Sequence, residues 1–327
     1  MADLPPLTTT DTRASLASMH EIDPSPVDDE EDPSMDTSSP YPTTDPTDPS
    51  SSTKDSSSSH AASPSQGTTN LLGLTPTRTL HLLTALQKYS VAPLGLYLAM
   101  HYTNTALIPL VTPSVRAADK YLLLTRPFYQ TPPLEPLLIF LPVLTHVVSG
   151  VALRVYRRRI TALRHGAETR SQRRGIAWPK LSATSAAGYA LYPMFALHVL
   201  SMRVTPRRVD GSSASVGLRY FAHGIAAHPG LGLAAHALLI VTASYHFVSG
   251  AARFLRLSTE YVVGGGEDGR VKRKWRGRVI NGVAALMAGV WIVGGLGVVG
   301  RSGPGVGWEA SHWNAIYKEV PLVGRLF

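Results

Sequence analysis

The sequence contains no cysteine. This absence excludes a disulfide framework, a thiolate nucleophile and a zinc site with cysteine ligands. The first residues, MADLPPLTTT, lack both a basic start and an apolar run, so they predict neither a secretory signal peptide nor an arginine-rich mitochondrial presequence. The chain also shows no Ser-His-Asp set, carboxylate pair or phosphate-binding loop. We therefore expect a protein that is not an enzyme and that reaches a membrane through internal segments.

Acidic residues are scarce outside the first 70 positions. Residues 1–70 hold 13 of the 22 acidic residues but only Arg13 and Lys54 as strong bases. A segment so rich in Ser, Thr, Pro and Asp buries too little apolar surface to offset the entropy of ordering. We expect a disordered acidic tail over residues 1–78. The rest of the chain is basic and apolar, so its charge does not by itself indicate nucleic acid.

Five stretches without Asp, Glu, Lys or Arg approach the ~20 residues that cross a bilayer. These stretches are residues 91–111, 136–153, 181–202, 229–252 and 279–300. Five such stretches with basic flanks do not fit the core of a soluble protein of this size. The sequence predicts an all-α membrane protein with five transmembrane helices within residues 79–302 and a short C-terminal tail, 303–327. Prolines inside the spans predict kinks, because neighbouring groups in a bundle can satisfy the freed carbonyls.

The basic residues between the spans predict the orientation. Residues 154–180 and 253–278 together hold 17 Lys and Arg, whereas residues 116–126 and 203–219 hold three and four. The positive-inside bias places the 17-base face in the cytosol. With five spans, the N-terminal tail shares that face. Topology signalling is the main role we expect for these loops, although they also suit anionic lipid headgroups.

Two of the spans contain nearly the same phrase. Residues 145–150 read THVVSG and residues 245–250 read YHFVSG. The repeat predicts a duplicated two-helix unit, formed by the first four spans. Each of these spans carries one candidate histidine: His101, His146, His198 and His246. Ionisable side chains within a membrane usually face the bundle interior and mark a functional site.

Paired imidazoles on facing helices predict a haem site. Neutral imidazole is an axial ligand of haem iron, and His146 and His246 lie at a matched depth of roughly 10–12 Å. Gly150 and Gly250 follow them by four residues and leave room for a porphyrin. We expect a bis-histidyl haem b at this pair and a second haem at the pair of His101 and His198. No metal other than haem iron is expected.

Two alternatives remain for these histidines. They can serve as interhelical hydrogen-bonding groups, or they can form a zinc site, although the spans lack the supporting carboxylates. His236, like His81, His223 and His228, lies near the end of a span, and we interpret it as interfacial.

One patch of the tail differs from its surroundings. Leu16, Met19 and Ile22 are spaced by three residues and precede Pro24-Ser25-Pro26. Apolar residues on one helical face followed by a Pro-x-Pro predict a short linear binding motif over residues 16–26, with Leu16, Met19, Ile22, Pro24 and Pro26 as its contact residues.

Several phrases resemble one family. These are LAMHYTNTALIP (98–109), GYALYPMFALH (188–198) and the repeated histidine phrase. They resemble the fungal MDM-ten-complementing proteins of the mitochondrial outer membrane. That resemblance implies a multi-pass protein with a cytosolic N-terminus and a role in lipid homeostasis at membrane contact sites. Membrane lipids and a large bridge-like lipid-transfer protein of the vacuolar-protein-sorting class, which recognises Pro-x-Pro, are the implied partners. The family is also distantly similar to the cytochrome b subunits of succinate dehydrogenase and fumarate reductase.

Three functions follow as hypotheses. The first is a non-enzymatic adaptor that recruits the lipid-transfer protein through residues 16–26. The alternative is a bis-histidyl haem b membrane cytochrome, which acts as an electron carrier, in a transmembrane oxidoreductase activity, or as a haem-bearing sensor. The third is lipid scrambling along polar groups within the spans, such as Thr103, Asn104 and Ser244, although interhelical hydrogen bonds explain these groups equally well.

Overall fold

The computed structural model describes residues 73–167 and 169–327, and its regular elements there are all helical, without a β-strand. The all-α fold class is confirmed. The chain divides into two units, Met1–Pro76 and Thr77–Phe327, and the account below concerns the second. The α-helices are α2 (Pro76–Tyr89), α3 (Val91–Tyr102), α4 (Ile108–Val111), α5 (Val115–Thr125), α6 (Pro127–Gln130), α7 (Leu141–Arg164), α8 (Arg170–Gly175), α9 (Ala183–Val199), α10 (Thr205–Asp210), α11 (Leu218–Ala227), α12 (Pro229–Phe254), α13 (Gly266–Trp291) and α14 (Gly307–Lys318). The π-helices are η1 (Thr103–Leu107), η2 (Pro136–Phe140), η3 (Leu200–Val204) and η5 (Ile292–Val299), and the 3₁₀-helices are η4 (Thr259–Tyr261) and η6 (Gly324–Leu326).

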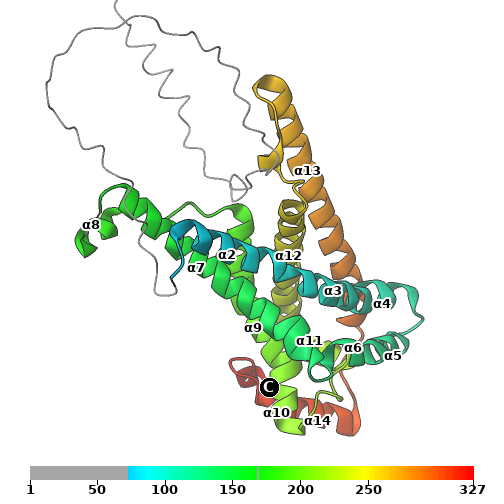
Figure 1. Ribbon diagram of the computed structural model, residues 1–327. Helices are drawn as coiled ribbons and strands as arrows, with labels where there is room; N and C mark the ends of the chain where they lie inside the picture. The colour runs from blue at the N-terminus through cyan, green and yellow to red at the C-terminus, as the bar shows by residue number, and fades with distance from the viewer. Residues whose placement is uncertain (1–72, 168) are drawn as a thin grey trace, which may run out of the picture. The chain divides into compact units, whose positions relative to one another are not determined.

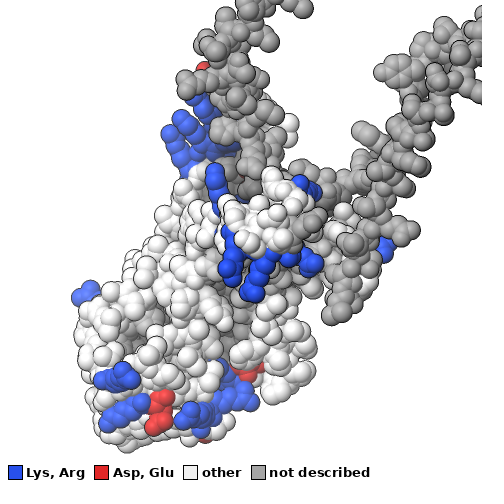
Figure 2. All heavy atoms as spheres, turned by 90° about the vertical axis from the view of Figure 1, so that its left-hand side faces the viewer, with Lys and Arg blue, Asp and Glu red and all other residues white. Residues whose placement is uncertain are grey.

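Helices occupy all five predicted spans. Within the part of the chain that the structure describes, three helical segments are long and apolar enough to cross a membrane: Pro136–Arg164, Pro229–Tyr261 and Gly266–Val299. The first and third predicted spans are also continuous helices, formed by α3, η1 and α4 and by α9 with η3. These two include more polar side chains, such as Asn104, which lower their mean hydropathy. Figure 2 shows a band without charged side chains between two groups of Lys and Arg, as expected for a bundle embedded in lipid.

The helices form two hairpins that share a bundle. The first hairpin is α3 and α7, and the second is α9 and α12. Helix α13 packs along α12, and its π-helical continuation η5 packs against η1. In Figure 1, α5, α6, α10 and α14 gather at one end of the bundle, while α8 and the first turns of α13 lie at the other.

Each of three π-helices precedes a proline. A proline has no backbone N–H, so it cannot donate the usual hydrogen bond to the carbonyl four residues before it. The helix geometry around the proline therefore changes. The adjustment here is a widened turn in which the donor reaches back five residues. Ile108 donates to Thr103, Leu141 to Pro136 and Thr205 to Leu200, and each donor stands immediately before Pro109, Pro142 or Pro206. The kinks predicted at Pro109 and Pro142 are thus π turns, which keep carbonyls satisfied inside the bundle, whereas Pro193 lies within the α-helix α9.

The first span and the last cross at a glycine. A Cβ on Gly294 of η5 would overlap the carbonyl group of Ala106 in η1. Beside this contact, the indole Nε1 of Trp291 donates to Thr105 Oγ1 at 3.0 Å. In lipid, helices associate through close packing and interhelical hydrogen bonds rather than through the hydrophobic effect. The absent side chain of Gly294 therefore permits the close approach on which this packing depends.

A buried ion pair joins the two hairpins at the end that carries α10. Arg203 of η3 holds Glu135, which precedes η2, with two hydrogen bonds of 2.6 and 2.5 Å. The side chain of Glu135 is only 6% exposed, so it lies within the protein rather than reaching the membrane interface. Ser213 accepts a further hydrogen bond from Arg203. Because removal of one partner leaves an uncompensated buried charge, this pair fixes how the hairpins meet.

The C-terminal residues 303–327, expected to form a short tail, include helix α14. Trp313, Ile316 and Tyr317 of α14 pack with Tyr220 of α11 in a buried apolar cluster. The rings of Tyr220 and Tyr317 stack with their centres 4.5 Å apart. Burial raises the pKa of both phenols well above the usual range, so both hydroxyls remain hydrogen-bond donors. Tyr220 donates to Ser201, and Tyr317 donates to the carbonyl of Tyr220.

Replacing Gly294 by valine should destabilise the bundle. The added side chain would collide with the backbone of η1, and overpacking of this kind costs about 1–3 kcal/mol. Scanning fluorimetry of the purified protein in detergent should show a lower Tm. Gly289→Val on the same helical segment is the control, because a Cβ at Gly289 meets nothing within 4 Å. Equal Tm values for the two variants would contradict the proposed crossing.

Candidate functional site: facing histidines within the bundle

His146 and His246 adjoin each other, with the edge of one ring toward the other, as a pair predicted from the repeated phrase. His146 projects from α7 and His246 from α12, and their ring centres are 6.2 Å apart at an interplanar angle of 74°. Both side chains are partly buried. The serine that follows each histidine by three residues turns back into its own helix, since Ser149 donates to the carbonyl of His146 and Ser249 to that of Tyr245. The hydroxyl groups of these serines are therefore satisfied within their own helices and do not bond to the histidine rings.

A backbone carbonyl orients each ring of this pair. The carbonyl of Gln87 lies 3.1 Å from Nδ1 of His146, and the carbonyl of Thr184 lies 2.9 Å from Nδ1 of His246. A carbonyl oxygen can only accept, so each Nδ1 carries the proton and each Nε2 keeps its lone pair. Metal-binding histidines usually have this arrangement, in which a hydrogen bond to the second nitrogen sets the tautomer and the ring orientation.

The two orienting carbonyls occupy equivalent places in the two hairpins. Gln87 stands 14 residues before His101, and Thr184 stands 14 residues before His198. The carbonyl of Thr184 belongs to α9, the first helix of its hairpin, whereas that of Gln87 belongs to α2, which precedes the first hairpin; each orients a histidine on the second helix of the hairpin. The duplication that the sequence predicts from one phrase therefore extends to the hydrogen bonds that hold the site.

The glycine that matters most for His246 is not one of the two expected. A Cβ on Gly188 of α9 would lie 2.7 Å from Cε1 of His246, so the ring fits only because Gly188 has no side chain. Gly150 leaves room for the side chain of Gln87 instead, and the position of Gly250 is open, with nothing within 4 Å. Sequence spacing missed Gly188 because the contact joins two helices, although the residue opens the phrase GYALYPMFALH.

His101 and His198 form the second predicted pair. Their ring centres are also 6.2 Å apart, at 69°. His101 stacks on Tyr97 and meets the edge of Trp291. The Nδ1 atom of His198 is buried and has no hydrogen-bond partner among the described residues. This pair therefore lacks the carbonyl contacts that orient His146 and His246.

A third imidazole adjoins this second pair. The ring of His236 lies 6.2 Å from that of His198, at 77°, and its Nδ1 donates to the carbonyl of Gly232 at 2.9 Å. The interpretation of His236 as interfacial is wrong. His236 lies only eight residues after His228, the residue that precedes α12. Helices α9 and α11 nevertheless pack on α12 around this ring, whose centre lies 4.8 Å from that of Phe221.

The spacing of both predicted pairs suits a shared metal. A coordinating imidazole nitrogen lies about 2 Å from a metal and about 1.2 Å from the centre of its own ring, so two rings on opposite sides have centres about 6.4 Å apart. The observed 6.2 Å is close to this value, and it is also the distance between the rings of His198 and His236, which meet in an ordinary edge contact. Over the described residues, no group of three or more His, Asp and Glu side chains could hold a metal ion. The arrangement thus fits a cofactor with two axial ligands better than a tetrahedral ion.

The predicted partner-binding residues Leu16, Met19, Ile22, Pro24 and Pro26 lie outside the described residues. Nothing in the structure bears on that motif.

One comparison with known proteins identifies the bundle. No curated protein and no solved structure matches the chain. A family model described as the transmembrane domain of MDM10-complementing protein 1 matches residues 96–191 and 193–304. The match covers all four predicted histidines and more than half of the chain. The chain therefore belongs to the MDM10-complementing protein 1 family of mitochondrial membrane proteins.

Proposed function

We propose that this protein is an adaptor of the mitochondrial outer membrane that supports lipid homeostasis by recruiting a bridge-like lipid-transfer protein of the vacuolar-protein-sorting class at organelle contact sites. The observation that carries the proposal is the family match across the bundle. The helical bundle acts as the anchor, and residues 16–26 act as the motif that the partner recognises. The 17 Lys and Arg between the spans support a cytosolic position for the N-terminal tail, where such a partner is accessible.

The adaptor role predicts that the double variant Pro24→Ala/Pro26→Ala captures the lipid-transfer protein about tenfold less efficiently in a pull-down with full-length protein. Short motifs concentrate binding energy in a few anchoring residues, and the fixed backbone of proline lowers the entropy cost of docking.

The tail offers a matched control for this experiment. Pro40-Tyr41-Pro42 is another Pro-x-Pro, but it lacks the preceding apolar residues at a spacing of three. Pro40→Ala/Pro42→Ala should therefore leave capture unchanged. Undiminished capture by the Pro24→Ala/Pro26→Ala protein would remove residues 16–26 from the proposal.

The histidine geometry favours a second function. We infer that His146 and His246 hold a haem b, so that the bundle also acts as an electron carrier or a haem-bearing sensor. Haem would supply a redox-active iron, and the imidazoles of His146 and His246 would hold it. The chain itself orients the two rings through the carbonyls of Gln87 and Thr184.

The haem function predicts a reduced-minus-oxidised difference spectrum with an α-band in protein purified from haem-replete cells. His146→Ala or His246→Ala should remove the haem of this pair, because loss of an axial ligand weakens binding by more than the 10–100-fold typical of an outer-shell change. His81→Ala is the control, since His81 is exposed on α2. Absence of the band in the wild-type protein would leave the histidines as interhelical polar groups.

The contact between Gly188 and His246 makes a separate prediction. Gly188→Val should displace the ring of His246 and reduce haem content about tenfold or more, because the added Cβ would lie 2.7 Å from the imidazole. Gly230→Val is the matched control, because it adds the same side chain to α12, the helix of His246, where a Cβ meets nothing within 4 Å. Haem content is measured per mole of protein. Equal loss in both variants would show that the substitution acts on folding and not on the ring.

A further inference from the structure

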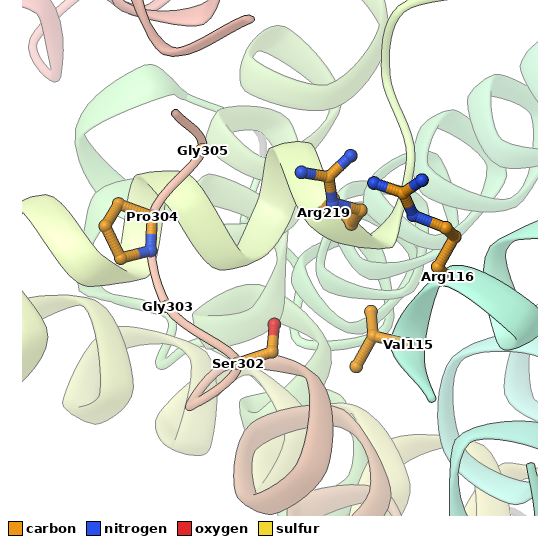
Figure 3. Close-up of a pocket in the computed structure, with 7 residues that line it drawn as sticks. All are labelled: Val115, Arg116, Arg219, Ser302, Gly303, Pro304 and Gly305. Carbon is orange, nitrogen blue, oxygen red and sulfur yellow. The ribbon is translucent and has the colours of Figure 1, made fainter. Parts of the chain in front are cut away.

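A hollow of about 260 Å³ lies at the end of the bundle that carries α5, α11 and α14. Three separate segments line it: Val115 and Arg116 from α5, Arg219 from α11, and residues 302–305 between η5 and α14. In Figure 3 the guanidinium groups of Arg116 and Arg219 lie on one side and residues 303–305 on the other. A second hollow of about 620 Å³ shares Arg116 and Arg219 and continues past Lys120. Residues far apart in the sequence therefore converge on one basic recess.

The segment between η5 and α14 is fixed in place beneath the two arginines. The N–H of Gly305 donates to Nδ1 of His223 at 3.1 Å, so the Nε2–H of His223 donates to Asn314 Oδ1 at 2.8 Å. A Cβ on Gly305 would lie 2.6 Å from the ring of Trp313. The wall of the hollow is thus part of the packed core of α11 and α14.

The charges around the recess do not balance. Glu309 pairs with Arg219 at 2.7 Å, and the guanidinium of Arg219 also lies over the ring of Trp313. The carboxylate of Asp119 accepts the N–H of Leu218, at the first turn of α11, at 2.8 Å. Both acids are therefore engaged. Arg116, by contrast, has neither an ion pair nor a hydrogen bond to any residue that the structure describes, and Lys120 is exposed beside it.

Apolar side chains surround the mouth of the second hollow. Leu123, Val306 and Trp308 line it, and they are 47%, 73% and 80% exposed. Tryptophan and large aliphatic residues beside cationic groups are typical of the boundary between lipid headgroups and acyl chains. A soluble anion has no apolar part that could contact these side chains. A lipid, in contrast, can place its phosphate among the basic residues and its acyl chains along the apolar side chains.

We propose that the recess formed by Arg116, Arg219 and the 302–305 segment binds the phosphate of an anionic phospholipid headgroup. Guanidinium forks match the oxygen atoms of a phosphate, and the unbalanced charge of Arg116 supplies the attraction. The first hollow is smaller than the roughly 300–1,000 Å³ that hold a whole small-molecule ligand. It therefore admits a headgroup while the chains remain outside. The site lies at the opposite end of the bundle from the two loops that hold 17 bases, so it is separate from topology signalling.

Native mass spectrometry of the full-length protein in detergent tests this site. The probes are dioleoyl phosphatidic acid, dioleoylglycerol, which lacks the phosphate, and inorganic phosphate. The wild-type protein should retain phosphatidic acid but not dioleoylglycerol. Arg116→Ala should weaken retention of phosphatidic acid about tenfold, because one charge-assisted contact is lost. Arg116 is exposed and forms no contact that the fold requires, so this variant should keep the wild-type Tm.

A matched variant distinguishes lipid binding in the recess from non-specific attraction by positive charge. Arg301→Ala removes the same charge at the same end of the bundle from an exposed residue that lines neither hollow, and it should bind phosphatidic acid as the wild type does. Equal loss in the two variants, or undiminished binding by Arg116→Ala, would overturn the proposal. Retention of dioleoylglycerol as strong as that of phosphatidic acid would do the same. If inorganic phosphate displaces the lipid at equal concentration, the recess is a free-phosphate site and the lipid assignment is wrong.

Discussion

An imidazole inside a lipid bilayer is stabilised by a hydrogen-bond partner within the protein, because hydrocarbon offers none and an unsatisfied polar group there is costly. In this protein, the carbonyls of Gln87 and Thr184 meet that requirement for His146 and His246. The helices that supply these carbonyls must therefore lie beside α7 and α12, in a fixed register. One hydrogen bond thus holds α2 against α7, and its counterpart holds α9 against α12.

The same requirement explains the irregular helices. Pro109, Pro142 and Pro206 remove N–H donors, and the π turns before them return carbonyls to the hydrogen-bond ladder by reaching back five residues. The fourth π-helix, η5, has no proline directly after it, and the absent side chain of Gly294 allows it to approach η1 directly. Kinks that would destabilise a soluble helix become places where two spans fit together, because neighbouring helices surround them.

The charged side chains gather at the two ends of the bundle. The buried pair of Glu135 and Arg203 joins the hairpins at one end of the bundle, and the basic recess of Arg116 and Arg219 lies at the same end. The loops rich in Lys and Arg lie at the other. An adaptor anchored by this bundle would have one face for a cytosolic partner and another for lipid headgroups, with the paired histidines between them. The adaptor and haem functions use different parts of the chain, so one does not exclude the other.

The sequence by itself determined the helical class, the positions of the five apolar segments and the two histidine pairs. Each of these follows from local properties: runs without charge, and one phrase that occurs twice at 100 residues' separation. Only the tertiary structure decided that Gly188 makes room for His246, that His236 lies beside His198, and that Arg116 and Arg219 share a recess. The tertiary structure likewise buries Glu135 against Arg203, 68 residues away. These features depend on contacts between helices, whose rotation and register are set by packing across the bundle and not by the spacing of residues along one helix.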